Sequence, residues 1–301
     1  MNYDLVTILG PTAVGKTKLA AKLAFRFNGE IISADSRQVY KGMNIGTGKD
    51  YNDYFVNGHK VNYHLIDIVE PYEDFNLFLF KEYFLNSFED IKGREKLPFL
   101  VGGSGLYLSS VLQKYELHKS DFESDEYDYL KTQSHDDLKK QLIELNSDLH
   151  NFTDLTEKER TIKAIIIEKT KNLTPALTTE INSLNIGIKL SREEIKSSIT
   201  QRLNERLEAG MIDEVQKLID SGISYEKLDF FGLEYRYLSL YIKDELNYND
   251  MFQKLNSAIH NFAKRQMTWF RKMEKEGIKI NWIDGQDYDN AVNIIKTELQ
   301  L

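Results

Sequence analysis

The sequence predicts an α/β protein with a parallel sheet of the P-loop NTPase type and covering helices. Short apolar runs alternate with segments of helical spacing through the first hundred residues, which is typical of strand–helix–strand units. A glycine-rich phosphate-loop signature follows the first of these runs. A segment of different texture, residues 114–155, is rich in Asp, Glu, Lys, Ser and Tyr. We therefore expect a core of residues 1–113 and 156–301, with a mostly helical insertion at 114–155 and a helical C-terminal region.

Six short apolar runs are the expected strands, at residues 3–9, 30–34, 61–68, 98–101, 186–190 and 277–282. Right-handed crossovers place the C-terminal ends of parallel strands at one edge of the sheet. Ligands of such sheets bind at that edge. The residues that follow each strand are therefore the first candidates for a site.

Helical spacing predicts the covering elements. Leu19, Leu23 and Phe27 recur on one helical face after the first strand, and residues 77–88 and 157–171 also read as helices. Within the insertion, the leucines at 138, 142 and 145 share one helical face. Ser191 and Glu194 form a capping-box signature, and helices follow to about residue 275 with breaks near Gly222 and Gly232.

Composition and charge exclude several classes of protein. The chain of 301 residues has no cysteine, which excludes a disulfide framework and a thiolate metal site. It has no stretch of 18 apolar residues and no basic segment before the first strand, so we expect a cytoplasmic protein without membrane contact. The net charge of −8 argues against non-specific nucleic-acid binding over the whole surface.

The segment after the first strand is a complete phosphate-binding loop of the form G-x-x-x-x-G-K-[ST]. Its glycines allow backbone N–H groups to point at phosphate oxygens, and the following helix adds its positive N-terminus. The Lys16 ammonium supplies a point charge, and the Thr17 hydroxyl is a candidate ligand for Mg²⁺. We predict a phosphorylated ligand at Gly10, Pro11, Thr12, Ala13, Val14, Gly15, Lys16 and Thr17.

Polar groups follow three other strands. Asp35 comes after the second strand, where a carboxylate can accept a proton, bind Mg²⁺ or begin a helix, and Arg37 would keep it ionised. Ser104 is predicted to be a hydrogen-bonding group, because Leu106 breaks the G-x-S-x-G pattern of a nucleophile. Asp67 is either the aspartate that supports Mg²⁺ in nucleotide hydrolases or a strand-end cap.

A basic and aromatic segment lies near the C-terminus. Residues 264–279 hold six Lys and Arg against two Glu, in a protein of net charge −8. On a helix, Lys264, Thr268, Arg271 and Lys275 share one stripe. A structural helix explains the aromatic residues but not this concentration of charge, whereas contact with a phosphate backbone explains the charge.

With these segments in view, the sequence resembles the tRNA dimethylallyltransferases, or tRNA isopentenyltransferases, of the bacterial type. The resemblance covers most of the chain and is strongest at residues 10–17, 35–47, 102–107 and 263–271. It implies transfer of a dimethylallyl group from dimethylallyl diphosphate to the exocyclic amine of an adenosine beside the tRNA anticodon. Mg²⁺ is the implied cofactor, tRNA and dimethylallyl diphosphate are the implied partners, and we expect a monomer.

The resemblance also implies roles for individual residues. Asp35 is the implied base, with Lys16 and Ser104 as the other catalytic residues. The phosphate loop and Arg202 are implied to bind the diphosphate, with Mg²⁺ held by Thr17. The insertion is implied to contact tRNA. Further tRNA contacts are implied for Asp35, Ser36, Arg37, Gln38, Ser104, Arg160, Lys163, Lys264, Arg265 and Arg271.

Several positions depart from the family pattern. Gly48 and Asp50 stand where Ala and Pro are usual, and Lys163 replaces a second tRNA-contacting arginine. Residues 125–127 read Asp-Glu-Tyr where the insertion usually has an arginine. These changes leave the core chemistry untouched and predict weakened or remodelled tRNA contacts.

Three alternatives stay open at this stage. A small-molecule or nucleoside kinase has the same loop and can use Asp35 as a base toward a hydroxyl, but it gives the basic stripe no role. A non-catalytic nucleotide-binding regulator does not need Asp35 and Ser104 at the phosphate edge. An adenylate isopentenyltransferase would act on a free nucleotide, whereas the basic helix favours a polymeric acceptor.

Overall fold

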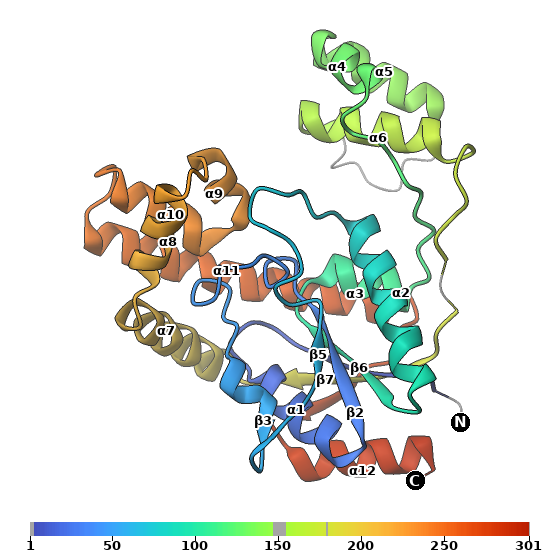
Figure 1. Ribbon diagram of the computed structural model, residues 1–301, viewed down its shortest axis with the longest axis vertical. Helices are drawn as coiled ribbons and strands as arrows, with labels where there is room; N and C mark the ends of the chain where they lie inside the picture. Colours follow the sequence, from blue (N-terminus) through green and yellow to red (C-terminus); the bar gives the residue numbers. More distant parts are fainter. Residues whose placement is uncertain (1–2, 147–154, 179, 301) are drawn as a thin grey trace. The chain divides into compact units, whose positions relative to one another are not determined.

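The computed structural model describes residues 3–146, 155–178 and 180–300 and contains two compact units (Figure 1). The larger unit comprises Met1–Lys114 and Glu180–Leu301, and the smaller unit comprises Tyr115–Thr179. Within the described ranges, no helix combines the length and the apolar character that crossing a membrane requires.

The larger unit is built on a parallel sheet of six strands in the order β5-β2-β6-β1-β7-β8. This confirms the predicted fold class. The predicted strand at 61–68 shrinks to two residues because Leu65 and Asp67 adopt positive φ angles of 63° and 56°. The strands of the sheet are β1 (Leu5–Leu9), β2 (Gly29–Ala34), β5 (Tyr63–His64), β6 (Leu97–Gly102), β7 (Ser183–Lys189) and β8 (Asn281–Asp284). A separate hairpin pairs β3 (Phe55–Val56) with β4 (His59–Lys60) and follows the short helix η1 (Tyr51–Tyr54).

Helices cover both faces of the sheet (Figure 1). The alternation of strand side chains shows this in β1, where Val6 and Ile8 belong to one apolar cluster, and Leu5 and Leu9 belong to the other. On the first face lie α1 (Lys16–Arg26) and α12 (Tyr288–Leu299), and on the second lie α2 (Leu77–Gly93), α3 (Gly105–Leu112) and α11 (Tyr248–Lys275).

The predicted C-terminal helices are also present. A capping box of Ser191 and Glu194 begins α7, as expected. The two predicted breaks are confirmed at Gly222 and Gly232, whose φ angles of 92° and 118° suit glycine. These helices are α7 (Arg192–Glu208), α8 (Met211–Asp220), α9 (Tyr225–Phe231) and α10 (Leu233–Ile242).

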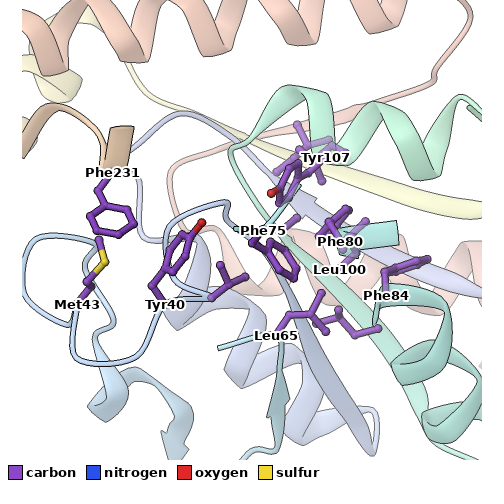
Figure 2. Close-up of a cluster of buried hydrophobic side chains, with 14 of the residues drawn as sticks. Tyr40, Met43, Leu65, Phe75, Phe80, Phe84, Leu100, Tyr107 and Phe231 are labelled. Carbon is purple, nitrogen blue, oxygen red and sulfur yellow. The ribbon is translucent and has the colours of Figure 1, made fainter. Parts of the chain in front are cut away.

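An aromatic cluster joins elements that are far apart in the sequence (Figure 2). The Phe80 and Tyr107 rings stack with centroids 4.0 Å apart and connect α2 to α3. The Tyr40 and Phe231 rings lie 4.8 Å apart and connect the loop after β2 to α9. Since aromatic pairs of this kind stabilise beyond the area they bury, this cluster fixes the loop after β2 on a rigid base.

The smaller unit packs three helices around its own apolar core. Leu138 and Leu142 pack with Ile162 and Ile165, and all four side chains are buried. The unit extends beyond the boundary expected at residue 155, because the isoleucines of the last helix pack with the other two helices. Its helices are α4 (Asp125–Thr132), α5 (His135–Leu145) and α6 (Lys158–Thr170).

A buried carboxylate joins three segments at the N-terminal end of β2. Glu30 is 1% exposed and accepts hydrogen bonds from both Nη atoms of Arg94, at 2.5 and 2.8 Å. Lys96, His64 and Asn62 contact the same carboxylate at 2.7 to 2.9 Å. The Arg94 guanidinium, with help from these neighbours, holds the pKa of Glu30 well below its usual value.

Replacement Glu30→Gln should therefore destabilise the fold by about 2–3 kcal/mol at pH 7. The loss is smaller than the ~3–5 kcal/mol of a fully buried pair, because Arg94 and Lys96 are 38% and 30% exposed. Since the folded pKa is depressed, this stability is present above the ordinary value of 4.5 and is lost as the pH falls below it. Urea unfolding at pH 7 and pH 4 measures both effects, with Asp90→Asn, which removes only an exposed partner of Arg94, as the control.

Candidate active site

Three neighbouring strands end at the same level of the sheet. Gly102 of β6 pairs with Ala34 of β2 on one side and with Leu9 of β1 on the other. The phosphate loop, the Gly103–Ser104 turn and Asp35 follow these three strand ends directly. They line one pocket of about 1260 Å³, together with residues of α7, α10 and α11. The structure thus brings together the groups that the sequence placed at one edge.

The phosphate loop has the tight backbone that its glycines permit. Gly15 has a φ of 78°, a backbone conformation that favours glycine, and the Gln286 side chain lies where a Cβ would stand. The members of the loop that line the pocket are Thr12, Ala13, Gly15, Lys16 and Thr17, whereas Gly10, Pro11 and Val14 do not line it. The Val14 side chain is buried in the core, so any ligand contact from it involves the backbone only.

The Thr17 hydroxyl fits the predicted role of metal ligand. It lines the pocket beside Lys16, and no hydrogen bond within the described residues engages it. A free hydroxyl directly after the lysine of a phosphate loop is the group that such loops use to bind Mg²⁺. The residues present are therefore compatible with Mg²⁺.

Lys16 is a half-buried cation inside the loop. Its Nζ donates to the Pro11 carbonyl at 2.7 Å. Burial, followed by the positive charge of Arg202, lowers the pKa of Lys16 to about 7, while Asp35 opposes this change. An anionic ligand would restore the lysine to its charged form, which suits a residue that binds phosphate.

Because the folded pKa of Lys16 is depressed, the charge destabilises the protein. The cost is complete below pH of about 7 and disappears as the pH rises toward the ordinary value of 10.5. Replacement Lys16→Met should therefore raise the free energy of unfolding by about 2–3 kcal/mol at pH 7, with a smaller gain at pH 9. Denaturant unfolding at both pH values measures this, and Lys18→Met, at an exposed position of the same helix, is the matched control.

Asp35 holds a turn after β2, where no helix begins. Its Oδ1 accepts the backbone N–H groups of Arg37 at 2.9 Å and Gln38 at 3.4 Å, which fixes the start of the next turn. Among the described residues, none donates a hydrogen bond to Oδ2. The carboxylate is thus oriented through one oxygen and retains the other for a ligand in the pocket.

The neighbours of Asp35 complete this wall of the pocket. The Ser104 hydroxyl accepts the N–H of Ser36 at 3.4 Å, so it supports the residue after Asp35 rather than Asp35 itself. The Arg37 guanidinium lies 4.6 Å above the Phe230 ring. Gln38 donates to the carbonyls of residues 47 and 48, so it holds the next loop in place.

Gln266 is a site residue that the sequence analysis did not identify. It is 7% exposed on α11, and its side chain accepts the N–H of Thr12 and donates to the carbonyl of Gly103, both at 2.8 Å. It therefore fixes the phosphate loop against the turn that carries Ser104. The only signal in the sequence was a polar residue on the buried face of α11, in line with Ala263, Phe270 and Met273.

Glu214 is a second residue at the site that the sequence analysis did not identify. Its carboxylate accepts the N–H groups of residues 44, 45 and 46 at 2.7 to 2.9 Å and the Tyr235 hydroxyl at 2.8 Å. A buried anion with four donors is well satisfied and holds the loop at 44–50 against α8 and α10. The sequence feature that could have identified Glu214 is a carboxylate on the apolar face of α8, which also carries Met211, Val215 and Leu218.

Some predicted residues lie outside the pocket. Arg202 and Arg265 line it, but Lys264 and Arg271 lie on the exposed face of α11. Arg160 and Lys163 belong to the smaller unit, where Lys163 pairs with Glu159 at 2.6 Å.

Asp67 has a structural role. Lys49 and Tyr51 donate to its two oxygens at 2.5 Å each, and Asp67 does not line the pocket. The residues described also contain no cluster of three His, Cys, Asp or Glu that could hold a metal. The alternative that Asp67 supports Mg²⁺ is therefore not favoured.

Comparisons with known proteins find related sequences over nearly the whole chain. Residues 38–273 match the family model described as IPP transferase, and residues 3–66 match one described as isopentenyl transferase. A tRNA dimethylallyltransferase 2 of Pelobacter propionicus is 49% identical over 94% of this chain and 90% of its own length. Another, from Phocaeicola vulgatus, is 47% identical over 98% of this chain and 99% of its own.

Solved structures show the same fold. A tRNA isopentenylpyrophosphate transferase from Bacillus halodurans is 31% identical, with a TM-score of 0.69 over 98% of this chain and 95% of its own. A eukaryotic dimethylallyltransferase acting on tRNA has a TM-score of 0.74 over 98% of this chain and 77% of its own. At 22% identity this second likeness supports the fold alone.

Proposed function

The chain belongs to the IPP transferase family of tRNA dimethylallyltransferases, and from this premise we propose how its pocket carries out the transfer. The donor is dimethylallyl diphosphate, and the acceptor is the exocyclic amine of an adenosine next to the tRNA anticodon. The observation that supports this most directly is the convergence of a phosphate loop, a carboxylate with one unengaged oxygen and a cationic wall in one pocket.

The exocyclic amine of adenosine is a poor nucleophile because its lone pair is delocalised into the ring. In the proposed step, the amine nitrogen bonds to the first carbon of the dimethylallyl group as the bond from that carbon to the diphosphate oxygen breaks. Oδ2 of Asp35 takes the proton that the nitrogen loses, while Oδ1 stays on the backbone N–H groups of Arg37 and Gln38.

The leaving diphosphate needs its charge neutralised. We propose that backbone N–H groups of the phosphate loop, together with Lys16 and Arg202, which line the pocket, neutralise the diphosphate. The Thr17 hydroxyl would hold Mg²⁺, which supplies further positive charge to the diphosphate when it is bound. In this proposal, the loop holds a leaving group rather than ATP.

The acceptor site requires a surface for tRNA phosphates. On α11, Lys264, Arg271 and Lys275 are exposed, and within the described chain none of them has an acidic partner within 4 Å. Two of their neighbours, Phe262 and Arg265, line the pocket. We propose that the tRNA backbone lies along this stripe, with the target base turned out of its stack toward the pocket.

Incubation with labelled dimethylallyl diphosphate, separately with bulk tRNA and with AMP, tests the proposal. Label should enter tRNA and not AMP, and it should require Mg²⁺. Transfer to AMP alone would instead establish a free-nucleotide prenyltransferase. Rapid ATP turnover without transfer of the label would support the kinase alternative.

A further inference from the structure

The two arginines of the pocket converge on one point of the backbone. Arg202 and Arg206 lie one turn apart on α7. A Cβ at Gly48 would lie 1.7 Å from Nη2 of Arg206 and 2.5 Å from Nη2 of Arg202, so both guanidiniums approach the backbone at this glycine. Two positive groups this close to each other repel, and the pocket must supply anions that offset the repulsion.

Burial and the crowding of these cations lower the pKa values of two of them. Burial, followed by the positive charge of Arg202, lowers the pKa of Arg206 to about 10. The same two causes lower the pKa of Lys16. Arg206 also has a buried Nε atom with no hydrogen-bond partner. The three cations therefore form one positive cluster whose hydrogen-bonding capacity is only partly used.

Each arginine pairs with its own carboxylate. Nη2 of Arg202 lies 2.7 Å from Oδ2 of Asp50, in the loop after β2. Nη1 of Arg206 lies 3.6 Å from Oε1 of Glu234, on α10. All four residues line the pocket in which an anionic ligand would bind.

We propose that Asp50 and Glu234 are displaceable counter-ions of the donor site, which pair with Arg202 and Arg206 until a diphosphate takes their place. This inference rests on the proposed function, because it takes a diphosphate as the ligand of the pocket. The carboxylates compete with the ligand for the guanidiniums. They therefore weaken diphosphate binding and help the diphosphate product to leave after transfer.

The geometry of the two ion pairs indicates that exchanging a carboxylate for the ligand costs little free energy. The side chains of Arg202 and Asp50 are 30% and 52% exposed, and exposed ion pairs contribute little to stability. The Arg206–Glu234 pair is less exposed, but its separation of 3.6 Å exceeds a good hydrogen bond. Neither pair holds its arginine so strongly that a multiply charged ligand could not replace the carboxylate.

Calorimetry with inorganic diphosphate in the presence of Mg²⁺, at constant ionic strength, tests the proposal on the full chain. Asp50→Asn and Glu234→Gln keep the side-chain shapes and remove the charges. Each should tighten diphosphate binding about two- to fivefold, and the double variant should tighten it about four- to twentyfold. In the transfer assay, the same variants should be inhibited more strongly by added diphosphate.

Asp53→Asn is the matched control, because Asp53 lines the same pocket but makes no ion pair within the described residues. It should change diphosphate affinity less than either test variant. Equal tightening by the control would show a general field effect and overturn the proposal.

Weaker or unchanged binding in properly folded variants would show that the carboxylates only position the arginines, and would also overturn the proposal. Melting curves check folding, and the exposed Asp50 variant keeps the test valid if Glu234→Gln unfolds. A parent protein that binds no diphosphate would instead contradict the proposed function itself.

Discussion

Replacement Asp35→Asn should slow the transfer step by about 10²- to 10⁴-fold, which is the usual contribution of a general base. Asn keeps an oxygen that can accept the N–H groups of Arg37 and Gln38, so the local turn should survive. It cannot take the proton that the amine nitrogen loses. The loss should therefore fall on the rate of transfer and not on the affinity for tRNA or donor.

Single-turnover transfer from labelled dimethylallyl diphosphate, with enzyme in excess over tRNA, measures this rate directly. Asp53→Asn is a suitable control, because it makes the same chemical change at another aspartate that lines the pocket. An Asp35→Asn rate within threefold of the parent rate, in a protein that still binds both substrates, would remove Asp35 from its role as base.

The groups that define the chemistry could be predicted because they are local in sequence. The phosphate loop is a contiguous motif, and Asp35 and Ser104 follow apolar runs that are recognisable as strands. The parallel arrangement then places their strand ends together, since β6 lies between β1 and β2. The position of these residues directly after predicted strands was therefore what allowed most of the site to be predicted.

The supporting groups could not be predicted in the same way, because their contacts join distant segments. Gln266 contacts Thr12 across 254 positions of the chain, and Glu214 contacts Asn44 across 170 positions. Each occupies a buried helix position where an apolar residue would be equally compatible with helical spacing. Only the tertiary structure shows which backbone groups they satisfy.

The boundary of the smaller unit shows a related limit. Residues 157–171 read correctly as a helix, but the pattern of its isoleucines does not say which partner it packs against. The short β5 has a different cause, because two residues with positive φ break an apolar run that otherwise reads as a strand. The secondary structure of a segment was thus easier to predict from the sequence than the elements against which it packs.

Replacement of Lys264, Arg271 and Lys275 together by Gln should weaken tRNA binding and flatten its salt dependence. Each lost phosphate contact removes about 0.7 to 0.9 log units per decade of salt, so the slope should fall by about two to three. Donor affinity should not change, because none of the three residues lines the pocket. Filter binding of tRNA at several salt concentrations measures the slope.

The smaller unit is a less suitable place for the main phosphate contact, since residues 115–179 hold fourteen Asp and Glu against nine Lys and Arg.

A control for the α11 variant, with the same change in net charge, replaces Lys22, Arg26 and Lys296 by Gln. These residues are exposed on α1 and α12 over the other face of the sheet. If tRNA docks on α11, this control should keep a slope close to that of the parent. Equal slopes in the α11 variant and the parent, with matching melting curves, would exclude this stripe from the tRNA-binding surface.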